Sequence, residues 1–240
     1  MHIPKLISAA LFLLPLYLNA EEVLDQNVRD EANALIAQSF QSDLGYQIIE
    51  SLTTEVGQRL AGTEAEARAR DWGVAKFKQL GFKNVRIEPF QVDHWERHSE
   101  HAEITSPFPQ KLMITALGGS IATDSAGIVG QVVRFENLQA LKDAPMKDLK
   151  GKIVFVDEYM TRTQDGSGYG VAVKKRSGAA VEAGKRGAAA ALIRSVGTDH
   201  HRFPHTGQMT YDQNVVKVPI AALSAPDADQ LHRALGRGDV

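Results

Sequence analysis

Apolar, β-rich segments alternate with a helical stretch of small residues in the second half of the chain, and this alternation restricts the possible folds more than any other feature. Residues 153–156 and 189–193 have the composition of buried strands, and the alanine- and glycine-rich stretch 171–187 separates them. A helix between two buried strands is typical of a βαβ unit with parallel pairing. A further helix is expected after the capping residue Ser224. Two more strands are expected in this half, at residues 128–135 and 215–223.

The first half predicts helices followed by strands. Apolar residues recur at helical spacing over residues 23–40 and at every fourth position over residues 44–56. A third helix is expected to begin after Thr63, because a glutamate three positions later completes a capping box, and to end at Gly81. Alternation of apolar and charged residues over 85–90 predicts that a strand follows this helix. Two more short strands are expected, at residues 101–105 and 111–116.

The N-terminal segment has the pattern of an export signal. Lys5 precedes an apolar run over residues 6–18, and Ala20 stands directly before two glutamates. The run is shorter than the about 20 apolar residues that a spanning helix needs, and Pro15 would kink such a helix. We therefore predict a signal peptide over residues 1–20 and a secreted or periplasmic protein. An uncleaved N-terminal anchor is the alternative.

Composition excludes several classes of function. Lysine and arginine number 27 against 29 aspartate and glutamate, so the chain lacks the positive charge of a protein that binds nucleic acid through its phosphates. The chain contains no cysteine, which excludes disulfides, zinc sites with thiolate ligands and cysteine nucleophiles. Any catalysis therefore depends on oxygen and nitrogen groups, or on a metal held by histidines and carboxylates.

The histidines are the candidate metal ligands, and two groups of them stand out. His94, His98 and His101 lie close together in the sequence. Their spacing does not match the His-Glu-x-x-His pattern of zinc peptidases, so a solvated hairpin is favoured over a metal site. The loop 199–205 contains three histidines and an aspartate without regular spacing, and a polar surface loop is favoured there. Within it, His205 is the residue expected to reach a cleft if one exists.

Other catalytic patterns are weak. Residues 166–170 are rich in glycine but lack the spacing of a phosphate-binding loop, so a flexible loop is favoured. No Gly-x-Ser-x-Gly elbow occurs in the chain. Asp157 and Glu158 are adjacent at a strand end, so their side chains point to opposite faces and would not bracket one glycosidic bond. The residues alone predict an exported two-part α/β protein without a convincing catalytic set.

The order of several short segments resembles one enzyme family. Residues 57–63, followed by an amphipathic helix and Gly81, are similar to the start of the co-catalytic zinc exopeptidases of the carboxypeptidase Q type. Later segments resemble, in the same order, the protease-associated domain that is inserted in that family: 117–120, 150–154, 178–185, 191–195, 204–207 and 218–221. The resemblance spans nearly all of the chain after the predicted signal peptide.

The resemblance implies a fold and a domain division. The fold class is α/β: the N-terminal part of a zinc-exopeptidase catalytic domain plus a β-rich α/β protease-associated domain, with the C-terminal catalytic portion missing. Glycines cluster over residues 117–120, where the boundary is expected. The catalytic part would then occupy residues 21–117, and the protease-associated lid, incomplete at its C-terminal end, residues 118–240.

The resemblance also implies a metal centre that this chain does not complete. In such enzymes two zinc ions are held by histidine, aspartate and glutamate residues, and a glutamate acts as general base on the bridging water. The segments that carry these groups follow the insert and have no counterpart before Val240. We therefore expect two zinc ions in the full-length family enzyme and none bound by this chain, and we assign no catalytic or metal residue. Tyr169 and His205 are the candidates for facing substrate.

The predicted function follows from this resemblance. The chain is expected to be the N-terminal portion of a secreted or periplasmic di-zinc metallo-exopeptidase that hydrolyses short peptides. Two alternatives remain: a non-catalytic protease-associated module that binds peptides, and a truncated inactive product whose unpaired strand edges would aggregate. Short peptides are the expected partner; nucleic acid is not, and no stable membrane span is expected after signal cleavage.

Overall fold

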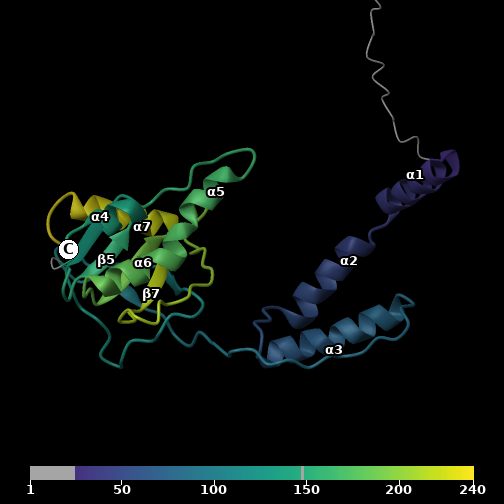
Figure 1. Cartoon of the computed structure of the whole chain (residues 1–240), viewed down its shortest axis with the longest axis horizontal. Helices are drawn as coiled ribbons and strands as arrows, with labels where there is room; N and C mark the ends of the chain where they lie inside the picture. The colour runs from purple at the N-terminus through teal and green to yellow at the C-terminus, as the bar shows by residue number, and fades with distance from the viewer. Residues whose placement is uncertain (1–24, 147–148) are drawn as a thin grey trace, which may run out of the picture. The chain divides into compact units, whose positions relative to one another are not determined.

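The computed structural model describes residues 25–146 and 149–240 (Figure 1). The predicted signal peptide, residues 1–20, lies outside the described residues. Among the helices that are described, none is both long and apolar enough to cross a membrane.

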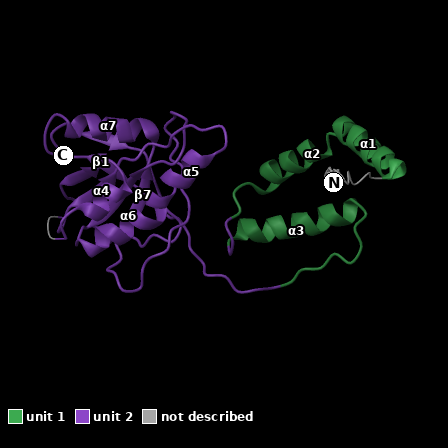
Figure 2. Ribbon diagram, turned by 45° about the horizontal axis from the view of Figure 1, so that its top comes forward, with its two compact units in different colours: residues 1–59, 63–88 green, residues 60–62, 89–240 purple. Residues whose placement is uncertain are grey.

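The described residues form two compact units (Figure 2). Unit 1 consists of the chain up to Arg59 together with Thr63–Glu88. Unit 2 consists of Leu60–Gly62 together with Pro89–Val240.

Unit 1 is helical. The predicted third helix is confirmed, and so is its cap, because the Thr63 hydroxyl accepts a hydrogen bond from the backbone N–H of Glu66 at 3.3 Å. Gly81 adopts φ of 84°, the left-handed conformation that ends the helix. The elements of unit 1 are α1 (Gln26–Gln41), α2 (Leu44–Ser51), a π-helical turn (Leu52–Val56) and α3 (Glu64–Gln79).

Few contacts hold the helices of unit 1 together. The indole N–H of Trp72 in α3 donates a hydrogen bond to the Ser51 hydroxyl in α2 at 2.8 Å. Val56 is the only buried hydrophobic residue among the described residues of this unit. Large apolar side chains stay at its surface, such as Phe40, which is 85% exposed.

The strand predicted over residues 85–90 does not form, and this prediction was wrong. Residues 85–101 contain neither helix nor strand. A strand is stabilised by the ladder of hydrogen bonds to a neighbour, and no described segment pairs with these residues. The alternating sequence is therefore present without the partner that would convert it into a strand.

Unit 2 is built on a five-stranded sheet in the order β3-β7-β6-β5-β4. The pairs β4–β5, β5–β6 and β6–β7 are parallel, which confirms the predicted parallel sheet, and β3 joins the edge antiparallel to β7. The strands are β3 (Ile114–Ala116), β4 (Val132–Phe135), β5 (Ile153–Val156), β6 (Ala190–Arg194) and β7 (Ile220–Leu223). A separate antiparallel pair lies before them: β1 (Ala102–Ile104) and β2 (Gln110–Leu112).

Helices cover both faces of this sheet (Figure 1). Successive residues of a strand point to opposite faces, so Val154 of β5 packs in a core with α4 and α6. Its neighbour Phe155 packs on the other side with α7 and the β1–β2 pair. The helices are α4 (Leu138–Asp143), α5 (Ser167–Ala172), α6 (Lys174–Lys185) and α7 (Ala225–Leu235).

Small residues explain how α6 packs so closely. Ala179, Ala180 and Ala183 are completely buried. At Gly184, a Cβ atom would lie 2.2 Å from the carbonyl oxygen of Val216, so no larger residue fits there without a shift of the backbone. The helix predicted from the alanine- and glycine-rich composition is therefore confirmed. Its small side chains allow the helix backbone to approach the neighbouring segments closely.

The glycine cluster at residues 117–120 lies inside unit 2. Leu117 is fully buried, and Gly118 both donates a backbone hydrogen bond to Gly207 and accepts one from Met209, each at 2.9 Å. Compact units and evolutionary domains need not coincide, so the domain limits of 21–117 and 118–240 stay a prediction.

Candidate functional site at the carboxyl end of the parallel sheet

The most concentrated polar chemistry in unit 2 lies where the parallel strands end. Ligand sites of open α/β sheets form at this edge, because the loops after each strand converge there. Asp157 directly follows β5 and is completely buried. Its carboxylate accepts hydrogen bonds from the Nε–H of Arg194, in β6, at 2.7 Å and from that of Arg134, in β4, at 2.6 Å. His232 Nδ1 of α7 lies 2.7 Å from the same carboxylate.

Arg194 connects this buried carboxylate to a second one, Asp229 at the start of α7. The Arg194 guanidinium lies 2.8 Å from Asp229, and the ring of Tyr159 lies against it with 3.7 Å between the guanidinium carbon and the ring centroid. Tyr159 donates its hydroxyl to Asp229, and His200 Nε2 lies 2.9 Å from the other carboxylate oxygen. Although burial acts to raise it, these hydrogen bonds lower the pKa of Asp229 to about 2. The network pairs both carboxylates with cationic or hydrogen-bonding side chains, as buried carboxylates require.

A second group of titratable side chains lies in the loop after β6. His201 Nε2 lies 2.7 Å from Asp199 Oδ2, and His205 Nε2 lies 2.9 Å from Asp199 Oδ1. Although burial acts to raise it, the hydrogen bond from its own backbone N–H and the two imidazoles lower the pKa of Asp199. The side chains of Asp199, His201 and His205 are 36%, 56% and 46% exposed, so the group is open to solvent.

Two anchors hold this loop to the sheet. The backbone N–H of His205 donates to the hydroxyl of buried Ser195 at 2.9 Å, and that hydroxyl donates to the Leu223 carbonyl at 2.6 Å. Arg202 makes two hydrogen bonds to the carboxylate of Asp227, at 3.0 and 2.7 Å. The loop is exposed but its two halves are tied to β6, β7 and α7.

The absence of a side chain at Gly197 lets the group come together. A Cβ atom at this position would lie 2.7 Å from Asp199 Oδ1 and 3.1 Å from the His205 ring. The first distance is far below a normal contact, so a larger residue would push Asp199 and His205 apart.

The two residues expected to face substrate both lie in unit 2. Tyr169 belongs to α5 and is 45% exposed, and its hydroxyl lies 3.2 Å from the Arg176 guanidinium. The same guanidinium packs against Gly207, where a Cβ atom would lie 2.7 Å from its NH1 nitrogen. Arg176 thus connects the helix of Tyr169 to the segment that follows His205. Neither residue's contact with a substrate is tested by this geometry.

Other segments singled out in the sequence do not form sites. Residues 166–170 were predicted to be a flexible loop, and this prediction was wrong: Gly166 caps α5, and the helix includes Gly168, which is buried against the Thr161 carbonyl. His94 lies 3.5 Å from Glu96, and His101 lies 3.7 Å from Glu103. Within the described ranges, these histidines belong to no group of three metal-ligating side chains.

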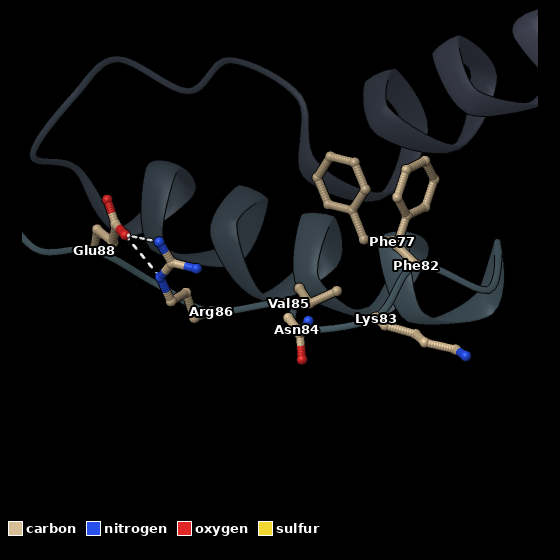
Figure 3. A pocket seen from close by; sticks show the side chains of 7 residues that line it. All are labelled: Phe77, Phe82, Lys83, Asn84, Val85, Arg86 and Glu88. Carbon is tan, nitrogen blue, oxygen red and sulfur yellow. Dashed lines mark hydrogen bonds and ion pairs between the residues drawn. The ribbon is translucent and has the colours of Figure 1, made fainter.

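A hollow of about 420 Å³ lies on unit 1 (Figure 3). Phe77 and Phe82 meet edge to face at one end, with ring centroids 5.3 Å apart, and Arg86 pairs with Glu88 at the other. Both members of this ion pair are more than two-thirds exposed. Glu88 is the one carboxylate in its lining and is paired with Arg86, so this hollow contains no group of metal-ligating side chains.

Sequence reasoning missed the Asp157–Arg194–Asp229 network. The sequence contained a signal for this network, because Asp157 directly follows one predicted parallel strand and Arg194 directly follows the next. Adjacent parallel strands bring their carboxyl ends together, so charged residues at both ends predict a pair. The loop 199–205 was considered, but its irregular spacing did not reveal that three of its side chains meet.

Comparisons with known proteins give consistent similarities. No family model matches the chain. Carboxypeptidase Q of Bos taurus is 37% identical over 197 residues, which cover 81% of this chain and 40% of the relative. Carboxypeptidase Q of Xenopus laevis is 36% identical over 193 residues, covering 80% and 40% respectively. The chain thus spans less than half the length of these curated relatives.

Solved structures agree. A Peptidase M28 precursor from Shewanella amazonensis SB2B is 47% identical with a TM-score of 0.85, covering 89% of this chain and 48% of that one. A zinc aminopeptidase from Bacillus subtilis, BSAP, is 19% identical with a TM-score of 0.50 and shows similarity of fold alone.

The described residues do not fit a two-zinc centre. Asp199, His201 and His205 are the one group of three metal-ligating side chains found in the described part of the chain. A pair of ions needs more ligands than these three residues supply. The relatives and the M28 structure nevertheless agree, because each is similar to this chain over at least 80% of this chain's length.

Proposed function

We propose that this chain is the N-terminal portion of a secreted or periplasmic di-zinc exopeptidase that hydrolyses short peptides. The observation that carries the proposal is the 47% identity and TM-score of 0.85 to an M28 peptidase over 89% of the chain. The names of the curated relatives, carboxypeptidase Q, point to the same reaction class.

In this proposal the chain supplies a framework and a lid rather than the metal centre. Residues 21–117 are the first part of the catalytic domain, and residues 118–240 form the protease-associated lid. The match to about 40% of the length of the curated relatives supports this division of labour. The zinc pair and its general base then belong to a part of the enzyme beyond these residues.

The first test is an assay of the 240-residue chain with short peptides and added Zn²⁺. We expect no hydrolysis above the rate in buffer. Reading the coding DNA past the codon for Val240 is the companion experiment, and an in-frame continuation with His-x-Asp and Glu-Glu segments is expected. Zinc-dependent turnover by the chain itself would show that the metal centre was wrongly placed outside it.

Tyr169 and His205 are proposed to face the substrate from the lid. Both are about half exposed, and Arg176 connects their two segments. In the complete enzyme, Tyr169→Ala and His205→Ala should each raise KM or lower kcat. Val171→Ala, on the same helix as Tyr169 and 61% exposed, is the matched control. Kinetics unchanged for both variants would remove this role.

A stand-alone peptide-binding module is the second candidate. It is favoured by the cores of unit 2, which this unit builds from its own strands and helices. Calorimetric titration of the chain with short peptides separates the two ideas. Tight binding without turnover, together with a stop codon directly after Val240, would favour the module.

A further inference from the structure

We propose that Asp199, His201 and His205 bind one divalent transition-metal ion, with Zn²⁺ as the ion that suits these ligands. The site lies in the loop after β6. It departs from the expectation that this chain binds no metal, and it does not depend on the proposed peptidase function.

The distances between the ligand atoms are close to those of a bound ion. Zinc bonds of about 2.0–2.2 Å in a tetrahedral arrangement place neighbouring ligand atoms about 3.3 Å apart. The two histidine–carboxylate separations are 2.7 and 2.9 Å, and all three ligand atoms lie within 4.8 Å of one another. An ion between them therefore requires each histidine–carboxylate pair to open by about half an ångström.

The chemistry of the donors selects the class of ion. Two imidazoles and one carboxylate suit zinc and its neighbours in the first transition row, whereas calcium and magnesium prefer oxygen ligands alone. Three protein ligands leave a fourth tetrahedral position for water. The exposure of the group and the hollow of about 520 Å³ beside it, lined by His201, Arg202 and Phe203, give that position access to solvent.

The loop is already arranged for binding. Ser195 holds the backbone of His205, Arg202 ties the middle of the loop to Asp227, and Gly197 leaves room for Asp199 and His205 to meet. Preorganisation of this kind lowers the entropic cost of ordering the ligands.

The ion replaces existing contacts of the two imidazoles. Each Nε2 atom lies against an Asp199 oxygen, at 2.7 and 2.9 Å, and gives up this contact for a bond to the ion. A third contact is weaker. The backbone N–H of Phe203 lies 3.3 Å from His201 Nδ1, which acts as acceptor. Coordination through Nε2 leaves the imidazole proton on Nδ1, so this contact is lost. A contact of 3.3 Å is longer than a usual hydrogen bond, and its loss costs less than a metal–ligand bond contributes.

Zinc titration by calorimetry on the chelator-treated chain tests the site, with Co²⁺ absorption as the second readout. We expect one Zn²⁺ per chain and a tetrahedral Co²⁺ spectrum. Removing a supporting group of a zinc site costs up to about 100-fold in affinity. The double variant His201→Ala, His205→Ala removes two ligands and should lose at least that much zinc affinity. His200→Ala is the matched control, because His200 lies in the same loop but pairs with Asp229. It should bind zinc like the wild type.

Three results would overturn the site. The first is that the wild type shows no saturable zinc binding, and the second is that the wild type and the double variant bind zinc with equal affinity. The third is that the His200→Ala control loses as much zinc affinity as the double variant. Circular dichroism checks that each variant is folded. If the double variant is not, Asp199→Asn decides the question, because it keeps the size of a partly exposed side chain and removes its charge. Unchanged affinity in that folded variant contradicts the proposal.

Discussion

Units 1 and 2 obey the same local rules but differ in what they bury. Both contain capped helices, with Thr63 capping α3 and Ser224 capping α7. In unit 2, helices on both faces of a parallel sheet enclose two apolar cores. In unit 1, Val56 is the only buried hydrophobic residue among those described. Local signals therefore suffice to start and stop helices, but a core also needs elements that pack against one another.

Unit 1 also differs from unit 2 in the large apolar side chains at its surface. They include Phe40, Tyr46, Ile49 and Phe82, each more than half exposed. Where such side chains form a contiguous patch, the patch marks an interaction site or a tendency to aggregate. Unit 2 has exposed apolar residues too, but they surround a closed core, so the two units should respond very differently to the loss of an aromatic ring.

The largest expected difference comes from that loss. Phe155→Ala removes a fully buried ring from the sheet of unit 2 and should lower the free energy of unfolding by about 3–5 kcal/mol. Phe40→Ala removes an 85% exposed ring from unit 1 and should change it by less than about 0.5 kcal/mol. Urea unfolding of both variants measures the contrast. Comparable losses would mean that unit 1 buries Phe40 in solution.

The second prediction concerns a lysine that is buried in unit 2. Lys175 of α6 is fully buried, and burial lowers its pKa from 10.5 to about 8. Between these two values the unfolded chain holds a proton that the native chain has lost, so native stability rises with pH, by about 3 kcal/mol in total. Unfolding midpoints from pH 7 to about 10.5 should show this rise in the wild type and in the exposed control Lys174→Met. The rise should vanish in Lys175→Met; its persistence there would assign it to other groups.

The fold was largely predictable where the sequence pattern includes both a segment and the neighbouring segments that it packs against. The stretch 171–187 predicted a helix between parallel strands, and the structure has α5 and α6 there, with β5 and β6 paired in parallel. The alternation over residues 85–90 predicted a strand that does not form. Alternation shows that a segment suits a sheet, but pairing depends on a second segment that the pattern does not contain.

The site was less predictable because its residues meet through tertiary structure. Asp157 and Asp229 are 72 positions apart in the sequence and share Arg194 only because β5 and β6 end, and α7 begins, at one edge of the sheet. Asp199, His201 and His205 are near in sequence, but their meeting depends on Gly197 and on the Ser195 anchor. Neither requirement follows a helical or strand period.

A smaller effect is expected from the Asp229 carboxylate. Its folded pKa of about 2 lies below the ordinary 3.8, so its contribution to stability is present above pH 4 and disappears as pH falls towards 2. Asp229→Asn should lose about 1–2 kcal/mol near neutral pH, a figure reduced for partial exposure. The difference from wild type should shrink in acid. Chemical unfolding at several pH values measures it, with Asp212→Asn, whose carboxylate contacts only its own turn, as control. A difference that stays constant with pH would contradict the ionic explanation.

The smallest expected effect concerns helix capping, which both units use. Thr63→Ala removes the acceptor for the Glu66 N–H at the start of α3 and should cost about 0.5–1 kcal/mol. Because α3 has almost no buried face, this cost should appear as lost helix content in circular dichroism rather than as unfolding of the sheet. Thr63→Ser keeps the hydroxyl and should restore the signal. If Thr63→Ala instead shifts the unfolding midpoint of the sheet core, the two units are energetically coupled and the contrast between them is smaller than their burial indicates.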